Sequence, residues 1–434
     1  MASLINKTVV HPKHGQGRIE STKHGGMRLA VHFEGQKGLS FVRRDEVEFV
    51  AVSRKTVSHE QRQQSGKLKP RRMLEAFRLG IVPEDCITSF TFGREYETNQ
   101  LRNWLNQSSE GGLVMVGAYG SGKTHFLKYA RTCALHEGYA IASTEINPLE
   151  SPFSKPKRIY RQLVQNLQVP TRDGEILNFR RLLAKAFEHN LLSGHPYFQY
   201  VAKYRNNSDI WRWIEATEDD AKPYSPDNAY KDLPGLYGHH GNTANIFCYL
   251  LSTLGWLVRH KAIGAKGLLL MFDEAESLDQ SNTPTAIDRS YNFLDALIAT
   301  ANSEPELLDK PTGHRFTYAA YADTIPFLYQ KHSGLKNLIT FTSCEYGQQS
   351  QELGKLPTLY LEPLNSKALS GVFDQICTLY SEVFNLTEQQ LKVDEVREVV
   401  IDGHSPTRLA VKKYIEALDL VRFYPHRELS EILR

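Results

Sequence analysis

An eight-residue stretch, Gly117-Ala-Tyr-Gly-Ser-Gly-Lys-Thr124, has the residue types and spacing of the phosphate-binding motif GxxxxGK[ST]. An apolar run leads into it and a helical pattern follows, which is the context that the motif requires. Small residues let backbone N–H groups surround phosphates, and the following helix N-terminus adds partial positive charge. We therefore expect ATP here, with Lys123 reaching the β and γ phosphates and the Thr124 hydroxyl binding Mg²⁺. The predicted nucleotide-binding residues are Gly117, Ala118, Tyr119, Gly120, Ser121, Gly122, Lys123, Thr124 and His125.

A pair of carboxylates, Asp273 and Glu274, follows the apolar run 268–272. A strand buried on both faces would place the pair at its carboxyl end, beside the glycine loop if the two strands are neighbours. We expect Asp273 to bind the Mg²⁺ and Glu274 to polarise the attacking water. The predicted catalytic residues are these two and Lys123, with Thr342 and Ser343 as described below.

The stretch Asp273-Glu-Ala-Glu276 also resembles the DEAD/DEAH signature of helicases. However, the sequence contains one nucleotide-binding core, and no later segment resembles the arginine-rich motifs of a second helicase lobe. An ATPase with a single core is therefore favoured.

Two further positions are candidates. Thr342 and Ser343 end an apolar strand pattern at 337–341, where AAA+ proteins place a residue that senses the γ-phosphate or positions the water. The alternative is a strand that simply runs into a polar loop. Arg408 follows Gly403-His-Ser-Pro-Thr at the start of a helical pattern and resembles the sensor-2 arginine of Cdc6/ORC-type modules, which contacts the nucleotide. The alternative is an exposed arginine in a first helical turn.

The elements that must position these residues alternate between helix and strand from residue 71 onward. This pattern predicts an α/β fold with a parallel sheet. The glycine loop, the acidic pair and the resemblance to AAA+ modules at Thr342 and Arg408 imply that the fold is of the P-loop AAA+ (ASCE) type. We place the ATPase core at 71–365, a mainly helical insertion at about 171–245 and a helical lid at 366–434. Within the core, RRMLEAFRLG at 71–80 is expected to form a short helix.

The N-terminal region differs in composition. Residues 1–52 contain short β-branched and aromatic runs separated by glycine turns, which predicts a small all-β barrel, and residues 53–70 are expected to be a basic linker. Residues 1–72 hold 15 Lys/Arg and 6 Asp/Glu, although the net charge of the whole chain is only +3. Such a segment favours a polyanion such as DNA, or it is merely a solvated linker. The candidate contacts are Arg43, Arg44, Arg54, Lys55, Lys67, Lys69, Arg71 and Arg72.

Two resemblances to known families add expectations. Val10-His11-Pro12, the glycines that follow and the strand at 31–33 resemble the Tudor-like or SH3-like barrels of CarD-type regulators and UvrD/PcrA-type helicases, which contact RNA polymerase or other proteins. The region 71–434 resembles the BrxD ATP-binding proteins of bacterial phage-exclusion (BREX) systems. That resemblance is carried by the stretch 72–83, Phe92-Gly-Arg-Glu95, the glycine loop, 211–215, the Asp-Glu-Ala-Glu stretch and 289–294. It implies an ORC/Cdc6-like ATPase that works with DNA and a partner helicase or nuclease.

Other features exclude functions. No run of about 18 apolar residues could cross a bilayer and no signal peptide is evident, so we expect a cytoplasmic protein without a membrane partner. The five scattered cysteines are expected to be reduced, and the His239-His240 pair is interpreted as part of a loop. One interpretation is a homo-oligomer, for which Arg289 and Arg315 are candidate arginine fingers.

Three functions compete. The first is an ATP-hydrolysing protein that acts on DNA or nucleoprotein complexes in anti-phage defence. The second is an ATP-dependent switch that recruits RNA polymerase or a helicase through the barrel. The third, a small-molecule kinase, fits the glycine loop but gives no reason for the barrel or the acidic pair.

Overall fold

The computed structural model divides the chain into two compact units, Met1–Leu68 and Lys69–Arg434. It describes residues 8–23, 28–33, 35–36, 38–43, 46–49, 59–107, 110–223, 230–237, 243–280, 283–304, 329–401, 405–428 and 431. No helix within these ranges is long and apolar enough to span a bilayer.

The first unit is a curled antiparallel sheet in the order β4-β3-β2-β1-β5. Its inward-facing residues, Val9 to Val47, form a small apolar cluster that includes Phe33. Gly17 is needed where β2 crosses this cluster, because a Cβ there would lie 2.6 Å from the Phe33 ring. The strands are β1 (Thr8–His11), β2 (Gly15–Lys23), β3 (Arg28–Phe33), β4 (Ser40–Arg43) and β5 (Glu48–Phe49).

The second unit is built on a five-stranded parallel sheet in the order β12-β6-β11-β10-β7. The strand that precedes the glycine loop, β6, is therefore separated from the strand that ends at Asp273, β10, by β11 alone. The predicted α/β fold with an AAA-like parallel sheet is confirmed. The strands are β6 (Gly111–Val116), β7 (Ala140–Glu145), β10 (Leu268–Asp273), β11 (Leu335–Phe341) and β12 (Thr358–Tyr360).

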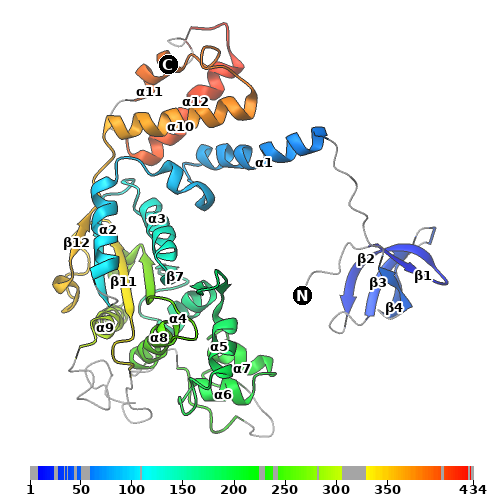
Figure 1. Cartoon of the computed structure of the whole chain (residues 1–434), viewed down its shortest axis with the longest axis vertical. Helices are drawn as coiled ribbons and strands as arrows, with labels where there is room; N and C mark the ends of the chain where they lie inside the picture. The colour runs from blue at the N-terminus through cyan, green and yellow to red at the C-terminus, as the bar shows by residue number, and fades with distance from the viewer. Residues whose placement is uncertain are drawn as a thin grey trace. The chain divides into compact units, whose positions relative to one another are not determined.

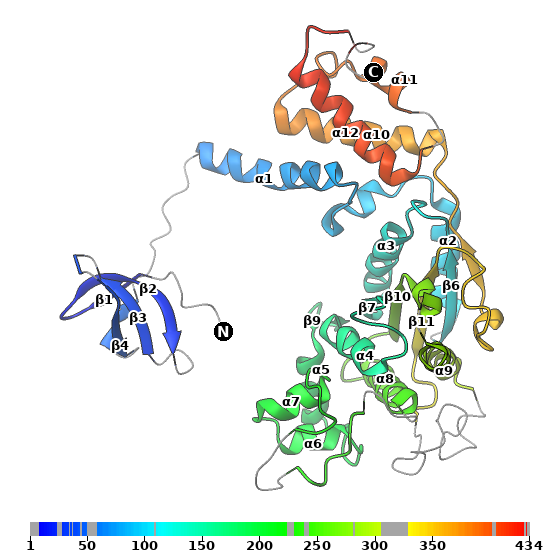
Figure 2. The ribbon, with the colours of Figure 1, turned by 180° about the vertical axis from the view of Figure 1, so that it is seen from behind.

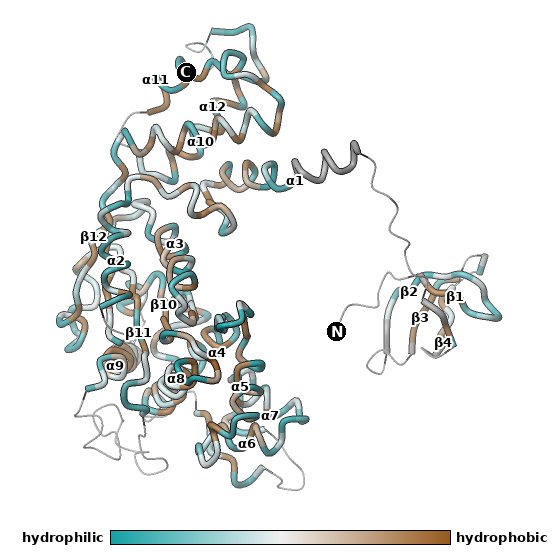
Figure 3. Tube along the Cα trace, in the orientation of Figure 1, coloured by the Kyte–Doolittle hydropathy of each residue, from teal (hydrophilic) through white to brown (hydrophobic). Residues whose placement is uncertain are grey.

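Helices cover both faces of this sheet (Figure 1; Figure 2 shows the view from behind). Alternate strand residues enter two different apolar clusters, one shared with α2 and α3 and the other with α4, α8 and α9. Helix α8 is buried along almost its whole length, and Figure 3 shows hydrophobic residues along it. The bounds are α2 (Glu95–Gln107), α3 (Lys123–His136), α4 (Pro156–Gln165), α8 (Thr243–Arg259) and α9 (Pro284–Ala301).

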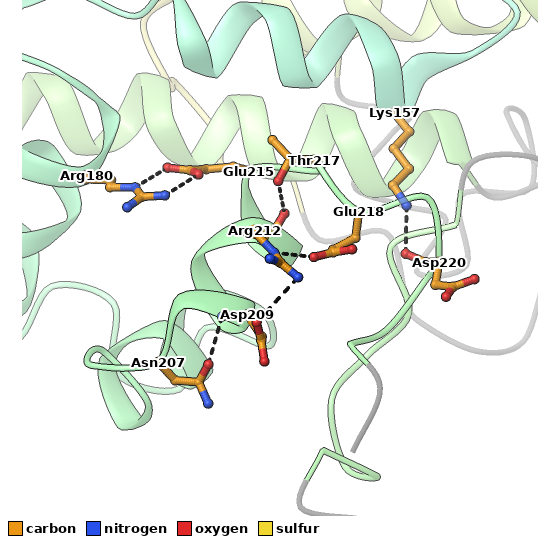
Figure 4. Close-up of polar contacts among 9 residues, drawn as sticks. All are labelled: Lys157, Arg180, Asn207, Asp209, Arg212, Glu215, Thr217, Glu218 and Asp220. Atoms are coloured by element: carbon orange, nitrogen blue, oxygen red, sulfur yellow. Dashed lines mark hydrogen bonds and ion pairs between the residues drawn. The ribbon is translucent and has the colours of Figure 1, made fainter. Parts of the chain in front are cut away.

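The predicted insertion is mainly helical, with a two-stranded ribbon at its start. Its helices are α5 (Phe179–Glu188), α6 (Phe198–Lys203) and α7 (Ser208–Ile214), and the ribbon joins β8 (Val169–Pro170) to β9 (Ile176–Leu177). Trp213 is 1% exposed and joins the core beneath the sheet. Figure 4 shows the turn after α7 held by ion pairs of Arg180 with Glu215 and of Arg212 with Glu218.

The lid contains helices α10 (Ser366–Phe384), α11 (Val393–Val400) and α12 (Thr407–Phe423). The C-terminal part of α1 (His59–Arg78) completes its core, because Leu74 and Phe77 belong to the same apolar cluster as α10 and α12. The expected helix at 71–80 is therefore too short: α1 begins at His59 and includes part of the expected linker. Glutamine, lysine and arginine are good helix formers, and they outweigh Gly66 and Pro70 there.

Candidate functional site

The glycine loop lies at the carboxyl end of β6, as in other open α/β sheets that bind ligands at this edge. Gly120 and Gly122 have φ angles of +80° and +97°, a conformation that only glycine adopts without strain. Gly122 ends the loop as the N-cap of α3, so the loop leads directly into that helix N-terminus. The backbone is thereby shaped for an anion at the point where the helix carries partial positive charge.

Lys123 is the first residue of α3 and is 9% exposed. Its ammonium group donates to the carbonyl oxygens of Gly117, at 2.8 Å, and Ala118, at 3.4 Å. Burial lowers its pKa, while the carboxylates of Glu276, Asp273 and Glu274 oppose that shift. The lysine is therefore held at the loop, with three acidic groups close enough to act on its charge.

The apolar strand β10 ends at Asp273 and places this residue at the same edge of the sheet. Asp273 is 8% exposed, and its Oδ1 accepts a hydrogen bond of 2.7 Å from the Thr340 hydroxyl. The backbone N–H of Glu274 is shared between Asp273 Oδ1, at 3.1 Å, and the Thr340 hydroxyl oxygen, at 3.2 Å. Thr340 lies inside β11, where Ile339 pairs with Phe272, so the strand register sets it beside Asp273. The sequence prediction overlooked Thr340, because a single hydroxyl inside an apolar strand does not show which neighbouring strand it will contact.

Glu274 has a φ of +56°, which is uncommon for a residue other than glycine. This conformation directs the chain out of β10 into the short helical turn that carries Glu276. Burial raises the pKa of the Glu274 carboxyl, and the carboxylates of Glu145, Asp273 and Glu276 add to that shift. A carboxylate with a raised pKa is a better proton acceptor than an ordinary glutamate, which suits the predicted role with water.

These residues line one cavity of about 380 Å³, called here the loop cavity. Its polar side consists of the glycine loop, Thr124, Asp273, Glu274, Glu276 and Thr342. Its opposite side is apolar and comes from the lid and the chain segment before α2, with Ile81, Val82, Phe92, Leu364, Val372 and Ile376. An apolar wall facing a phosphate-binding loop fits a molecule with a flat base at one end and phosphates at the other.

His125 lies in the wall between these two sides. Its Nε2 and the Thr91 hydroxyl oxygen are 2.9 Å apart, and the Thr91 hydroxyl also donates to the Ile87 carbonyl at 2.7 Å. Burial, together with the nearby Arg94 and Lys128, lowers the pKa of His125 to about 4. His125 is therefore neutral at physiological pH and adds no charge to the cavity.

The lid contacts the glycine loop directly. A Cβ placed on Gly120 would lie 2.8 Å from Cβ of Pro406, the residue that precedes α12. Arg408 is exposed, lines the loop cavity, and packs its side chain against Gly80. The structure thus brings Arg408 to the cavity from the lid, 284 residues beyond Thr124 in the sequence.

The oxygen atoms of Thr124 and Asp273 suit Mg²⁺, which prefers hard oxygen ligands and keeps several waters and substrate phosphates. Both residues line the loop cavity and also a second, polar cavity that includes Glu145. Across the residues that the structure covers, no group of three or more His, Cys, Asp or Glu side chains could hold a metal alone. Thr124 and Asp273 are the residues that would hold a Mg²⁺ ion together with nucleotide phosphates.

Several predicted residues lie elsewhere. Ser343 lines a separate hollow, where its hydroxyl accepts from the Glu345 N–H, whereas Thr342 lines the loop cavity. Arg289 is exposed on α9. Arg315, the His239-His240 pair, and the side chains of the basic candidates from Arg43 to Lys67 fall outside the described residues; Lys69, Arg71 and Arg72 are exposed on α1.

Comparison with known proteins gives one family match. Residues 67–179 match the family described as BREX system ATP-binding protein BrxC/D. No curated protein matches the chain. Among solved structures, a chain of the E. coli MS115-1 HORMA:CdnC:Trip13 complex matches with 12% identity and a TM-score of 0.32, over 87% of each chain. That likeness is too low to support an inference, so the AAA-like assignment rests on the strand order and the loop.

The family match covers β6, the glycine loop, α3 and the segment that contains Phe92-Gly-Arg-Glu95. The resemblance inferred from those sequence motifs is confirmed over this region. The matched region includes the whole phosphate-binding loop, so residues 67–179 are similar to the BREX system ATP-binding proteins BrxC/D.

Proposed function

We propose that the protein hydrolyses ATP with Mg²⁺ and uses the cycle to act on DNA or nucleoprotein complexes in anti-phage defence. One observation carries the hydrolytic part: Lys123 at the start of α3 and the Asp273-Glu274 pair at the end of β10 line the same cavity beside the glycine loop. The raised pKa of Glu274 beside the phosphate-binding loop suits a residue that accepts a proton from water.

In this proposal each residue has one task. The loop N–H groups and Lys123 hold the β and γ phosphates. Mg²⁺ held by Thr124 and Asp273 would offset the charge of the phosphates. Thr340 orients Asp273 through its hydroxyl, and Glu274 accepts a proton from the water that attacks the γ phosphate.

Paired substitutions test this assignment. Lys123→Ala should abolish nucleotide binding or turnover, because it removes the ammonium group that lies at the loop, 2.8 Å from the Gly117 carbonyl oxygen. Glu274→Gln should keep ATP binding and lose at least about a hundredfold in turnover, as removal of a general base does. Glu345→Gln, at an exposed position after β11, is the matched control and should behave as wild type. Normal hydrolysis by Glu274→Gln would show that the assignment of the base is wrong.

The nucleic-acid part of the proposal rests on the basic N-terminal region, whose exposed Lys69, Arg71 and Arg72 lie on α1. Contacts with DNA phosphates release counterions. The logarithm of the DNA-binding constant should therefore fall linearly with the logarithm of the salt concentration. ATPase rates with and without duplex or single-stranded DNA, measured across a salt series, test this. A rate that DNA leaves unchanged, together with slow turnover and tight ATP retention, would instead favour the ATP-dependent switch. A partner helicase or nuclease, and a location in the cytoplasm, are part of the same proposal.

A further inference from the structure

The segment Phe92-Gly93-Arg94 lies between the loop cavity and α2, and the catalytic roles above do not use it. Two of its residues pack against the lid helix α10. A Cβ placed on Gly371 would lie 2.9 Å from the Phe92 ring, and one placed on Gly93 would lie 2.5 Å from Cβ of Ala368. The absence of a side chain at both glycines therefore lets the 92–93 segment pack closely against α10. Gly93 also has a φ of +61°, so its conformation and its packing both favour glycine.

The third residue, Arg94, joins three elements through one buried guanidinium. Its Nη2 donates to the Ser121 carbonyl in the glycine loop at 2.6 Å. Its Nη1 donates to the Glu362 carbonyl, between β12 and α10, at 2.6 Å, and to the Glu97 carboxylate on α2 at 2.7 Å. Arg94 is 6% exposed and Glu97 is 7% exposed, so the charge of the guanidinium is paired within the protein.

A second contact ties the same two backbone segments together. Leu361, the residue before Glu362, donates its N–H to the Val116 carbonyl at 2.7 Å. A Cβ placed on Gly117 would lie 2.9 Å from the Leu361 carbonyl oxygen. The start of the glycine loop therefore packs on the connection to the lid, while Arg94 bonds to the end of the loop.

We propose that Phe92-Gly93-Arg94 couples occupancy of the glycine loop to the position of the lid, with Arg94 as a positioning residue. The guanidinium is a rigid planar fork, so the Ser121 and Glu362 carbonyls cannot separate while both bonds persist. Phosphate binding restricts the motion of the loop. Through its bond to the Glu362 carbonyl, Arg94 then restricts the segment that connects β12 to α10. Helix α10 in turn carries Val372 and Ile376, which form part of the apolar wall of the cavity. Fixing the loop therefore also fixes the part of the apolar wall that α10 contributes to the cavity.

This inference rests on ATP binding in the loop cavity, and hydrogen exchange of the full-length chain separates the two claims. In wild type, ATP with Mg²⁺ should slow amide exchange in the loop at 117–124 and in α10 together. Arg94→Lys keeps the positive charge but cannot bridge three acceptors in one plane. At saturating ATP it should protect the loop as wild type does, lose the added protection of α10, and show about tenfold weaker ATP binding.

Arg102→Lys is the matched control, since Arg102 is exposed on the same helix that Arg94 precedes. Gly93→Ala is a second variant that disturbs the contact with Ala368 and leaves the Arg94 side chain present; it should also uncouple α10. If Arg94→Lys and Gly93→Ala both keep ATP-dependent protection of α10, the coupling is refuted. If wild type shows no ATP-dependent protection in either region, ATP binding in this cavity is itself refuted.

Discussion

Replacing Thr340 with valine is the most direct test of how the acidic site is organised. Valine has nearly the same shape and is also β-branched, so it fits a fully buried position inside β11. The change removes the hydroxyl that donates to Asp273 Oδ1 at 2.7 Å. Asp273 Oδ1 would then keep only the longer bond of 3.1 Å from the Glu274 N–H. The carboxylate should become less well oriented toward Mg²⁺.

The size of the effect follows from the bond that is lost. A hydrogen bond to a charged acceptor contributes about 1.5–3 kcal/mol. Since about 1.4 kcal/mol corresponds to a factor of ten, Thr340→Val should reduce Mg²⁺-dependent ATPase activity by about 10-fold to 100-fold. Part of the loss should be recovered at high Mg²⁺ concentration, because weaker orientation of a metal ligand raises the concentration needed for half-maximal activity.

The assay is ATP turnover across a Mg²⁺ series, with two comparison variants. Thr342→Val tests the predicted sensor position and should lower turnover without changing the Mg²⁺ requirement. Thr132→Val removes an exposed hydroxyl on α3, bonded to the Lys128 carbonyl, and should leave both quantities unchanged. A Thr340→Val protein with the wild-type Mg²⁺ requirement and rate would refute the reasoning about Asp273.

Two further predictions concern stability. Burial alone would raise the pKa of Asp419, but hydrogen bonds from Arg78 and Tyr380 lower it overall. The ionised Asp419 therefore stabilises the folded protein above the unfolded pKa of about 4, and this stabilisation is lost at lower pH. Asp419→Asn should lower the free energy of unfolding in urea by about 1–3 kcal/mol at pH 7. An equally large decrease at pH 2 would contradict this. His195 accepts two backbone N–H bonds at Nδ1, and burial lowers its pKa to about 3. Because its folded pKa lies below the unfolded value of about 6.5, stability should fall by up to about 1.4 kcal/mol per pH unit below pH 6.5. His195→Asn, which can still accept these bonds but does not titrate, should fall less steeply; equal slopes in both proteins would exclude this role for His195.

The sequence by itself determined the phosphate-binding loop and the fold class. The loop requires glycines, lysine and threonine at fixed spacing on one continuous segment, so local chemistry is enough to reveal it. The helix and strand periodicities likewise predicted the parallel sheet that the structure confirms. The apolar run that ends at Asp273 was found for the same reason, since a strand buried on both faces is apolar along its length.

Tertiary structure alone decided which residues support the loop. Thr340 meets Asp273 only because β11 lies between β6 and β10 in a defined register, and a single threonine in an apolar strand carries no such information. Arg94 reaches Ser121 and Glu362, 27 and 268 residues away, so its role depends on packing between distant segments. Leu74 and Phe77 pack with the lid although helical periodicity shows only that they share a face. Periodicity and motif spacing act within one segment, whereas strand order, register and buried charge pairing act between segments; the sequence could therefore locate the phosphate-binding loop but not the contacts that hold it in place.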